Sequence, residues 1–331
     1  MRMLTVLCAD LSLTPDDIGA WPPTLARRLA RARVHGQSRD DSPIPLHTPA
    51  EAWLKRQFSV PENPSLTISA YLRHVHGATL TDLPAPDRVL TVTPAYLHAT
   101  LDHLVLSPAS ELTVTRRQAD ELAFAANAFL MEDNIELRVI TPDCWLLITP
   151  TSLKLELRGS LQASGRNIHA YMPGGEDGRR LRVLLNELQM LWHDHPVNQS
   201  RIENGQVPIN SLWVEGVVHS ADQASPAPFD QVVSKSPVTR GLATGFGVAT
   251  ISEDTSDDTK LATASATQNI LLELSGPNAI AELDSILSAT PKSVALTLCD
   301  QRNRLELLSA GNDRFRFWRR QALRVPPDPN R

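Results

Sequence analysis

The strongest structural signal in the sequence is a run of apolar residues at helical spacing, just past the middle of the chain. With 3.6 residues per turn, six apolar side chains fall on one face of a helix, and they are Leu181, Leu184, Leu185, Leu188, Leu191 and Trp192. Pro196 ends this helix, because proline lacks the backbone N–H that a helix interior needs. A shorter helix is expected from about 197 to 204, with Gly205 in the left-handed conformation that closes many helices. An apolar face this wide must pack on another layer, so the chain has a layered fold.

Strand-like runs accompany these helices, and the two kinds of segment together predict an α/β protein. Residues 4–7 form a short apolar run of the buried-strand type, and residues 211–214 form another. A second strong helix is expected over 115–131, with Thr115 as its N-cap, and strands follow at 135–140 and 145–148. We therefore expect a mixed sheet core with flanking helices and a smaller inserted α+β subdomain.

Weaker signals complete the expected order of elements. Helices are expected at 25–33, 50–58 and 66–74, extended segments at 88–92 and 103–106, a turn at 173–178 and a helix or turn at 239–247. Irregular structure is expected in a surface loop at 35–50, a linker at 220–228 and a polar, mobile segment at 255–267.

The length of 331 residues exceeds the usual size of one domain. The change of pattern near residue 88 and the strong helix from 181 suggest where the parts meet. We assign the α/β core to residues 1–87 and 181–331 and the inserted subdomain to residues 88–180.

The charge balance argues against a protein dedicated to nucleic acid. The net charge is −5, whereas nucleic-acid-binding domains usually carry a strong basic excess. A basic and aromatic cluster near the C-terminus keeps single-strand contacts open as an alternative, and it comprises Arg302, Arg304, Arg314, Phe315, Arg316, Phe317, Trp318, Arg319, Arg320 and Arg324. A final strand with Phe315 and Phe317 turned inward and arginines outward explains the same residues. The acidic balance favours the strand, so nucleic acid is not the expected partner.

The cysteines and the hydropathy predict a cytoplasmic protein without a membrane partner. Cys8, Cys144 and Cys299 are odd in number and far apart, in the spacing of neither a disulfide framework nor a metal site. No run approaches the ~18 apolar residues of a membrane helix. The first ten residues are ended by Asp10 and are too short for a signal segment, so a strand suits them better.

The richest group of polar side chains surrounds the expected corner between the 181–192 helix and the next helix. Four of them are candidates for binding a small anionic or phosphorylated ligand, namely His195, Asn198, Arg201 and Asn210. Arg201 is the best charge for such a ligand, and the asparagines supply hydrogen bonds. In the alternative interpretation, His195 and Asn198 satisfy backbone groups at the corner while Arg201 pairs with Asp194 or Glu203.

Other chemical motifs are weak or missing. His193 and His195 lie two positions apart, roughly 200° around a helix axis, so they cannot both face one metal ion while both are helical. Gly241, Gly245 and Gly247 form neither G-x-G-x-x-G nor a P-loop with its lysine, and tight packing of a helix explains them better. The G-x-S-x-G elbow of serine hydrolases is missing too. No cofactor is expected.

The stretch LLNELQMLWHDHPVN, residues 184–198, carries a family resemblance together with the residues after it, which are Arg201, Gly205, Pro208 and 210–213. It resembles the signature of a proteobacterial family, the regulatory proteins of the RpfE type. Residues 93–97, 127–133 and Trp145 resemble further parts of that family, and residues 317–320 resemble its closing motif. The resemblance implies a regulatory protein.

The pattern from His195 to Asn210 is also similar, more distantly, to one in archaeal-type cofactor-independent phosphoglycerate mutases of the alkaline-phosphatase superfamily. That resemblance implies an α/β core with a smaller inserted domain and a phosphate-ester site with two metal ions. It also makes Asp10 the one candidate metal ligand, because such enzymes place a metal-binding Asp at the end of the first strand.

The chain departs from the mutase pattern where the metal ligands belong. Phosphotransfer with two metal ions needs a hydroxyl nucleophile and a shell of carboxylates and histidines. The superfamily takes several histidines from the C-terminal half, but no histidine follows His219 here. We therefore expect a non-catalytic, mutase-like regulatory or binding protein, that is, a pseudoenzyme with a small ligand or a protein partner. The alternative is a surviving mutase or phosphomonoesterase that uses Asp10 and the pair Asp194–His195 in remodelled roles.

Overall fold

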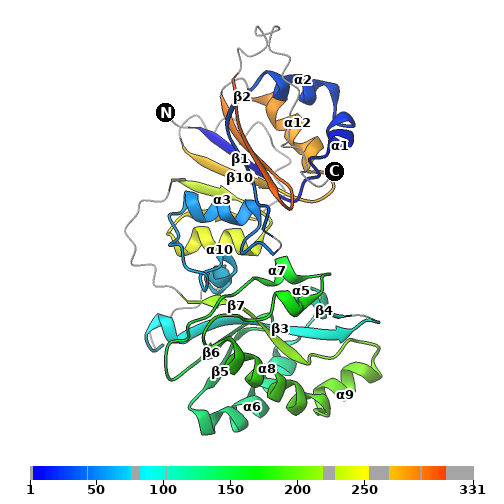
Figure 1. Cartoon of the computed structure of the whole chain (residues 1–331), viewed down its shortest axis with the longest axis vertical. Coiled ribbons are helices and arrows are strands. Elements are labelled where there is room, and N and C mark those ends of the chain that lie inside the picture. Colours follow the sequence, from blue (N-terminus) through cyan, green and yellow to red (C-terminus); the bar gives the residue numbers. More distant parts are fainter. Residues whose placement is uncertain are drawn as a thin grey trace. The chain divides into compact units, whose positions relative to one another are not determined.

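The computed structural model describes residues 3–42, 44–75, 83–101, 103–218, 228–252, 268–290 and 293–310 (Figure 1). The chain forms two compact units. The first combines Met1–Ser59 with Ser225–Arg331, and the second is Val60–Ala224. Each unit contains a sheet and its own apolar core.

The sheet of the first unit is mixed and has the strand order β2-β12-β11-β1-β10-β8-β9. Its strands are β1 (Leu4–Cys8), β2 (Arg33–Arg39), β8 (Gln231–Val233), β9 (Ala249–Ile251), β10 (Ile270–Leu274), β11 (Val294–Cys299) and β12 (Asn303–Ser309). The strands from β11 to β9 run parallel, whereas β12 and β2 are antiparallel additions at one side. The central strand β1 is buried throughout, as its unbroken apolar run predicts.

Helices flank this first sheet. They are α1 (Pro15–Gly19), α2 (Pro23–Arg31), α3 (Pro49–Gln57), α10 (Pro237–Gly245) and α12 (Ala279–Ala289). Leucines of α2 and α12 pack together on the apolar side chains of β1 and β10 to form the core of the unit. Proline stands at the first helical positions of α1, α2, α3 and α10, where its missing N–H costs nothing.

The sheet of the second unit is antiparallel and is built around the long strand β3 (Val89–Ala99). The other strands are β4 (Leu104–Ser107), β5 (Glu136–Thr141), β6 (Cys144–Ile148) and β7 (Ser211–Val217). The first half of β3 pairs with β6 and with β7, its last residues pair with β4, and β5 pairs with β6.

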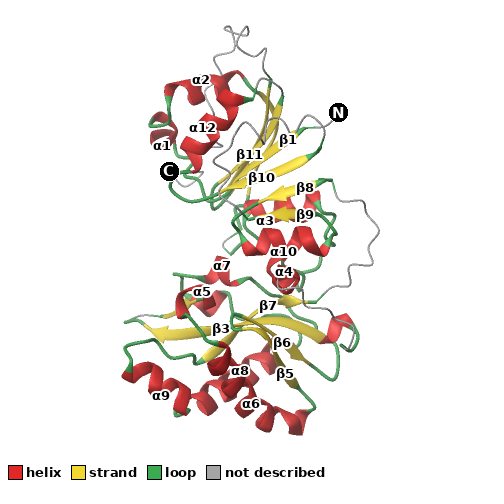
Figure 2. Ribbon diagram, turned by 180° about the vertical axis from the view of Figure 1, so that it is seen from behind, coloured by secondary structure: helices red, strands yellow, loops and turns green. Residues whose placement is uncertain are grey.

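Two long helices cover one face of this second sheet, α6 (Arg116–Leu130) and α8 (Gly178–His193), and α9 (Pro196–Glu203) continues the layer (Figure 2). Their buried side chains meet those of the sheet in one cluster, in which the rings of Trp145 and Trp192 stand edge to face at 6.1 Å. The shorter helices are α4 (Leu72–Val75), α5 (Ala109–Leu112) and α7 (Ser160–Ala163). Single 3-10 turns lie at Ile68–Tyr71, Pro86–Arg88, Met131–Asp133 and Ile168–Ala170.

The predicted fold class, α/β with a mixed sheet, is confirmed, and so are the helices predicted at 181–192 and 115–131. Thr115 forms the predicted cap, because its side chain accepts a hydrogen bond from the backbone N of Gln118. The expected loop at 35–50 is wrong over its first residues, because β2 extends to Arg39. This strand is polar and mostly exposed at the side of the sheet, so its sequence lacks the apolar alternation of a strand.

The observed units have bounds different from those expected for the core and the insertion. α8, α9 and β7, which we assigned to the core, belong to the second unit, because the apolar stripe of α8 packs on β3, β6 and β7.

Three predicted segments lie outside the described residues. They are most of the linker at 220–228, the mobile segment at 255–267 and the final strand around Phe315 and Phe317. In the described part of the chain, no helix has the length and apolar character needed to cross a membrane.

Candidate functional site

The predicted polar corner lies where α8 ends and α9 begins. His195 is the N-cap of α9, and its Nδ1 accepts a hydrogen bond from the backbone N of Val197 at 3.2 Å. Burial lowers the pKa of His195, against a smaller opposing effect of the Glu121 charge. The imidazole is therefore a neutral cap at neutral pH. His193 points elsewhere and is exposed, with its Nε2 3.9 Å from Oδ1 of Asp194.

The side-chain amides of the two asparagines at the corner bond to backbone N–H and carbonyl groups, as a neighbouring strand would. Asn198 is buried, and its Nδ2 donates to the carbonyl oxygens of Trp192 and Ile209, each at 2.8 Å. Its Oδ1 accepts from the backbone N of Ile209 at 2.7 Å. Asn210 forms the same paired arrangement with Leu97, accepting from its N and donating to its O at 2.8 Å each. These bonds fasten the segment between α9 and β7 to the end of α8 and to β3.

Arg201 is buried, and all of its observed bonds are internal. Nε donates to the carbonyl of Val207 at 2.8 Å, Nη1 to Oε1 of Gln118 at 2.9 Å and Nη2 to the carbonyl of Leu112 at 2.5 Å. It pairs with neither of the two acids suggested from the sequence. Burial lowers the pKa of Arg201, and its charge is compensated by these oxygen acceptors.

The corner thus brings the four predicted residues together, but their polar groups serve the fold. His195 and Asn198 satisfy backbone groups as the structural interpretation expects. A ligand at this corner would have to displace hydrogen bonds of buried groups, which costs about 1–3 kcal/mol for each group left unsatisfied. The ligand-binding assignment of His195, Asn198, Arg201 and Asn210 stays a prediction.

Asp10 stands at the carboxyl end of β1, the edge at which parallel α/β sheets usually bind ligands. The residues on either side of it are held by neighbouring strands: Ala9 N donates to the carbonyl of Leu274 at 3.0 Å, and Leu11 N to that of Cys299 at 2.9 Å. Asp10 itself is exposed and has a positive φ of 57°. The chain therefore turns sharply here and presents the carboxylate at the edge of the sheet.

Glu273 of β10 is the second carboxyl group near this edge, and it is partly buried. The hydroxyl of Ser234 donates to its Oε2, and the hydroxyl of Thr239 also bonds it. Burial raises the pKa of Glu273 strongly enough to outweigh these bonds, and the charge of Asp10 raises it further. A carboxyl group that is enclosed by hydroxyls and favours its protonated form is a poor ligand for a metal ion.

The two-metal site implied by the mutase resemblance does not fit the residues described here. Within the described ranges, no group of three or more His, Cys, Asp or Glu side chains is placed to hold a metal ion. Asp10 and Glu273 alone fall short of the ligand shell that a phosphotransfer centre requires. We derive no catalytic step through such a centre.

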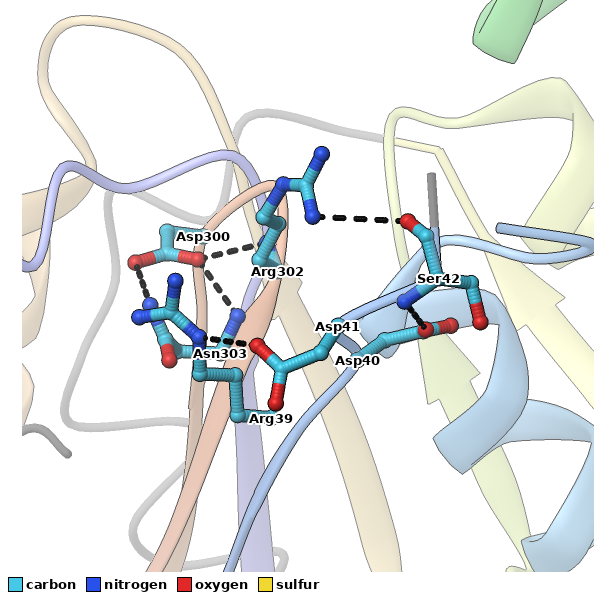
Figure 3. A network of polar contacts seen from close by, with 7 residues as sticks. All are labelled: Arg39, Asp40, Asp41, Ser42, Asp300, Arg302 and Asn303. Atoms are coloured by element: carbon cyan, nitrogen blue, oxygen red, sulfur yellow. Dashed lines mark hydrogen bonds and ion pairs between the residues drawn. The ribbon is translucent and has the colours of Figure 1, made fainter. Parts of the chain in front are cut away.

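Acidic side chains further along this sheet stabilise turns (Figure 3). The carboxylate of Asp300 accepts from the backbone N of Arg302 at 2.7 Å and from N and Nδ2 of Asn303 at 2.6 and 2.8 Å. These bonds close the hairpin between β11 and β12. Beside it, Arg39 Nε lies 2.6 Å from Oδ1 of Asp41, and Asp40 Oδ1 accepts from the backbone N of Ser42 at 2.8 Å.

Two arginines of the basic C-terminal cluster fall within the described residues, and both have internal partners. Arg302 Nη1 donates to the carbonyl of Ser42 at 3.3 Å, and Arg304 forms an ion pair with Glu306 at 2.9 Å. The cluster members from Arg314 onward lie outside the described residues. The glycine-bearing segment 239–247 is largely helical, since it falls in α10, which Ser236 caps through the backbone N of Thr239.

Sequence analysis missed two glutamates that stand inside apolar strands, Glu273 and Glu215. Glu215 of β7 accepts from Thr93 Oγ1 and from the backbone N of Ser160, at 3.0 Å each. The signal that marks both residues is a single acid inside an apolar strand, in ILLEL and in SLWVEGV. Such an acid must either be paired or keep its proton.

Comparison with known proteins relates the chain to one class of enzyme. Over 53 residues it is 42% identical to a probable 2,3-bisphosphoglycerate-independent phosphoglycerate mutase of Geobacter sulfurreducens, and equally identical to the 2,3-bisphosphoglycerate-independent enzyme of Methanosarcina barkeri. The matched segment is 16% of this chain and 13% of each enzyme. The chain is therefore distantly similar to these mutases. No protein-family model matches it.

A solved structure supports the fold over nearly the whole chain. The PH0037 protein of Pyrococcus horikoshii has a TM-score of 0.55 with 12% identity, and the match covers 94% of this chain and 89% of that one. A cofactor-independent phosphoglycerate mutase of Thermoplasma acidophilum has a TM-score of 0.45 with 14% identity, over 94% and 90%. The likeness to the Pyrococcus protein shows a shared α/β fold.

Proposed function

We propose that this chain is a non-catalytic relative of the cofactor-independent phosphoglycerate mutases and acts by binding a small anionic ligand or a protein partner. The RpfE-type regulatory family, suggested by residues 184–213, is part of this proposal, as is a cytoplasmic location. In this view the chain retains the architecture of a mutase, while the residues of its former reaction centre no longer catalyse phosphate transfer.

The observation that carries the proposal is the chemistry at the carboxyl edge of the first sheet. Asp10 occupies the position that the mutase resemblance gives to a metal ligand, yet the carboxyl group near it, Glu273, is partly buried, bonded by hydroxyls and raised in pKa. The full sequence adds that no histidine follows His219, so the chain beyond residue 219 has no imidazole to complete a metal site.

The second candidate is a mutase or phosphomonoesterase with a remodelled metal site, and the 42% identity over 53 residues favours it. It would use Asp10 and the pair Asp194–His195. His195 counts against this role, because its Nδ1 already accepts from Val197 N.

Metal analysis and turnover assays on the purified full chain distinguish the two candidates. We expect no stoichiometric divalent metal and no turnover of 2- or 3-phosphoglycerate or of p-nitrophenyl phosphate with Mg²⁺, Mn²⁺ or Zn²⁺ added. The control is Asp10→Asn, which leaves a non-catalytic protein unchanged in this assay. Turnover that Asp10→Asn removes, together with two tightly held divalent ions per chain, would overturn the proposal and establish the enzyme.

A further inference from the structure

A cavity of about 520 Å³ lies along the N-terminal half of α8, within the second unit. Three segments form its wall: the turn before β5, the residues after β6 and the first turns of α8 with the turn that precedes them. This volume is in the range that holds small organic molecules. None of the four ligand candidates from the polar corner lines it.

The inner wall of the cavity is apolar. Ile135, Leu181 and Leu184 are buried members of the core cluster, and Leu153 packs against that cluster. Val183 lies on the same helix with its side chain half exposed. A ligand in this cavity therefore meets a fixed apolar surface that belongs to the core of the unit.

Two positively charged side chains line one end of the cavity. Arg179 and Arg180 line it from the first turn of α8, where the helix dipole is also positive. Asp177 stands at the N-cap position, but its carboxylate accepts from the backbone N of Lys154 at 2.8 Å and makes no cap bond to the helix. The first-turn N–H groups of α8 thus have no side-chain cap.

The comparison with α6 shows how such a helix start is normally compensated. α6 also begins with two arginines, but Arg116 pairs with Asp120 at 2.9 Å and Arg117 with Glu121 at 2.7 Å. Thr115 and Gln118 close a capping box at its N-terminus. In α8 the positions one turn after Arg179 and Arg180 are valine and leucine. Within the described part of the chain, neither of these two guanidinium groups forms a hydrogen bond or an ion pair.

Three acids also line the cavity, namely Asp133, Glu176 and Glu187. The carboxylate of Glu176 is bonded to Nζ of Lys154 at 2.8 Å. Glu187 lies two turns further along α8 than Arg180, roughly 10 Å away at 1.5 Å per residue. The lining therefore has two arginines at the start of the helix, an apolar wall, and carboxylates on the turn before β5 and at Glu187.

We propose that this cavity binds a small organic anion, a phosphate or carboxylate attached to an apolar body. The anionic group accepts hydrogen bonds from the guanidinium groups and the backbone N–H groups of Arg179 and Arg180, and the body packs on Leu153, Leu181 and Leu184. A hydroxyl or amino group at the far end suits Glu187. The inference deepens the proposed function, because a protein that acts by binding needs a site of this kind.

The test uses phenyl phosphate as the probe, with inorganic phosphate and phenol as its two halves. Binding is measured by isothermal titration calorimetry and thermal shift on the full chain. We expect phenyl phosphate to bind and to raise the Tm, and each half to bind more weakly. The double variant Arg179→Ala/Arg180→Ala should weaken binding by about tenfold or more. The matched control Arg116→Ala/Arg117→Ala, at the start of α6, should retain it.

A second variant tests the cavity itself. Val183→Trp places an indole at the mouth from a half-exposed position, so it should abolish binding while the far-UV circular dichroism stays unchanged. The inference would be overturned if phenyl phosphate did not bind, or if the α6 control variant lost as much affinity for it as the Arg179→Ala/Arg180→Ala variant. Binding by a chain that also shows metal-dependent turnover would retain the cavity and remove the proposed function instead. Binding without turnover supports both.

Discussion

Arg201 of α9 donates a hydrogen bond from Nη1 to Oε1 of Gln118, the residue that closes the capping box of α6. The same oxygen of Gln118 accepts from the backbone N of Thr115 at 3.1 Å. One buried guanidinium thus links the start of α6 to α9 and, through Nη2, to the carbonyl of Leu112 at the end of α5. Arg201, which from the sequence is the best charge for binding a ligand, thus connects three helices of the fold.

Replacing Arg201 should therefore damage the fold. Arg201→Ala leaves the buried carbonyl of Leu112 without its donor, removes the bonds to Val207 and Gln118, and loses the side-chain packing, so we expect a loss of about 3 kcal/mol or more in the free energy of unfolding. Urea denaturation measures it. Arg117→Ala is the control, because its ion pair is exposed and its removal should leave the stability nearly unchanged. An Arg201→Ala protein as stable as the control would show that these bonds contribute little.

Local patterns predicted the elements that depend only on neighbouring residues. The stripe of α8 and the N-cap at Thr115 follow from spacing along the chain, and Asp10 was correctly placed at the end of the first strand. β2 was missed because it is a polar strand whose pairing with β12 joins residues about 270 positions apart. Its sequence alone contains no alternation to reveal it.

The site was harder to predict, because its chemistry depends on partners that are distant in sequence. The corner from His195 to Asn210 is recognisable as polar, but two of the partners of Arg201, Gln118 and Leu112, lie 83 and 89 residues away. Glu273 is bonded by Ser234 from another strand end. The cavity beside α8 exists only because three separate segments meet there. Spacing along the chain contains no information on such contacts.

His195 should make the protein less stable in mild acid. Burial lowers its folded pKa, so the folded state binds this proton less tightly than the unfolded chain does. Its contribution is present above the ordinary histidine pKa of about 6.5 and is lost as pH falls towards the lowered folded pKa. Protonation also removes the acceptor of the α9 cap. His195→Asn preserves a good N-cap without titrating, so its stability should fall less between about pH 7.5 and pH 5.5 in urea denaturation. An unchanged pH profile would refute this role.

Arg28 should stabilise the C-terminus of α12. Its Nη1 and Nη2 donate to the carbonyls of Leu287 and Thr290, and its Nε donates to Ser309 Oγ at 3.0 Å. We expect Arg28→Ala to lower the free energy of unfolding by about 1–2 kcal/mol, because helix-end carbonyls lose their donor. Arg27→Ala is the matched control, since exposed Arg27 donates to Pro23 O of its own helix at 2.9 Å and not to the end of α12. Equal losses in the two variants, measured by urea denaturation, would contradict the assignment.

The two glutamates inside apolar strands should make the protein less stable as pH rises. Burial raises the pKa of both Glu215 and Glu273, against the opposing effect of the hydrogen bonds that each accepts. Each folded-state carboxyl therefore holds its proton more tightly than the unfolded chain does, and unfolding releases it. The contribution is complete below the ordinary glutamate pKa of about 4.3 and is lost as pH rises through the raised folded value, at up to about 1.4 kcal/mol per pH unit for each group.

The double variant Glu215→Gln/Glu273→Gln tests this dependence, because glutamine keeps the shape and can hydrogen-bond the hydroxyls of Thr93 and Ser234, which accept as well as donate. Its free energy of unfolding should decline less than that of the wild type between about pH 5 and pH 8, and at the upper end it should equal or exceed the wild-type value. Exposed Glu203→Gln is the control and should follow the wild-type profile. If the double variant declined as steeply as the wild type, both glutamates would have to be ionised in the folded protein, and the argument that Glu273 is a poor metal ligand would fail with them.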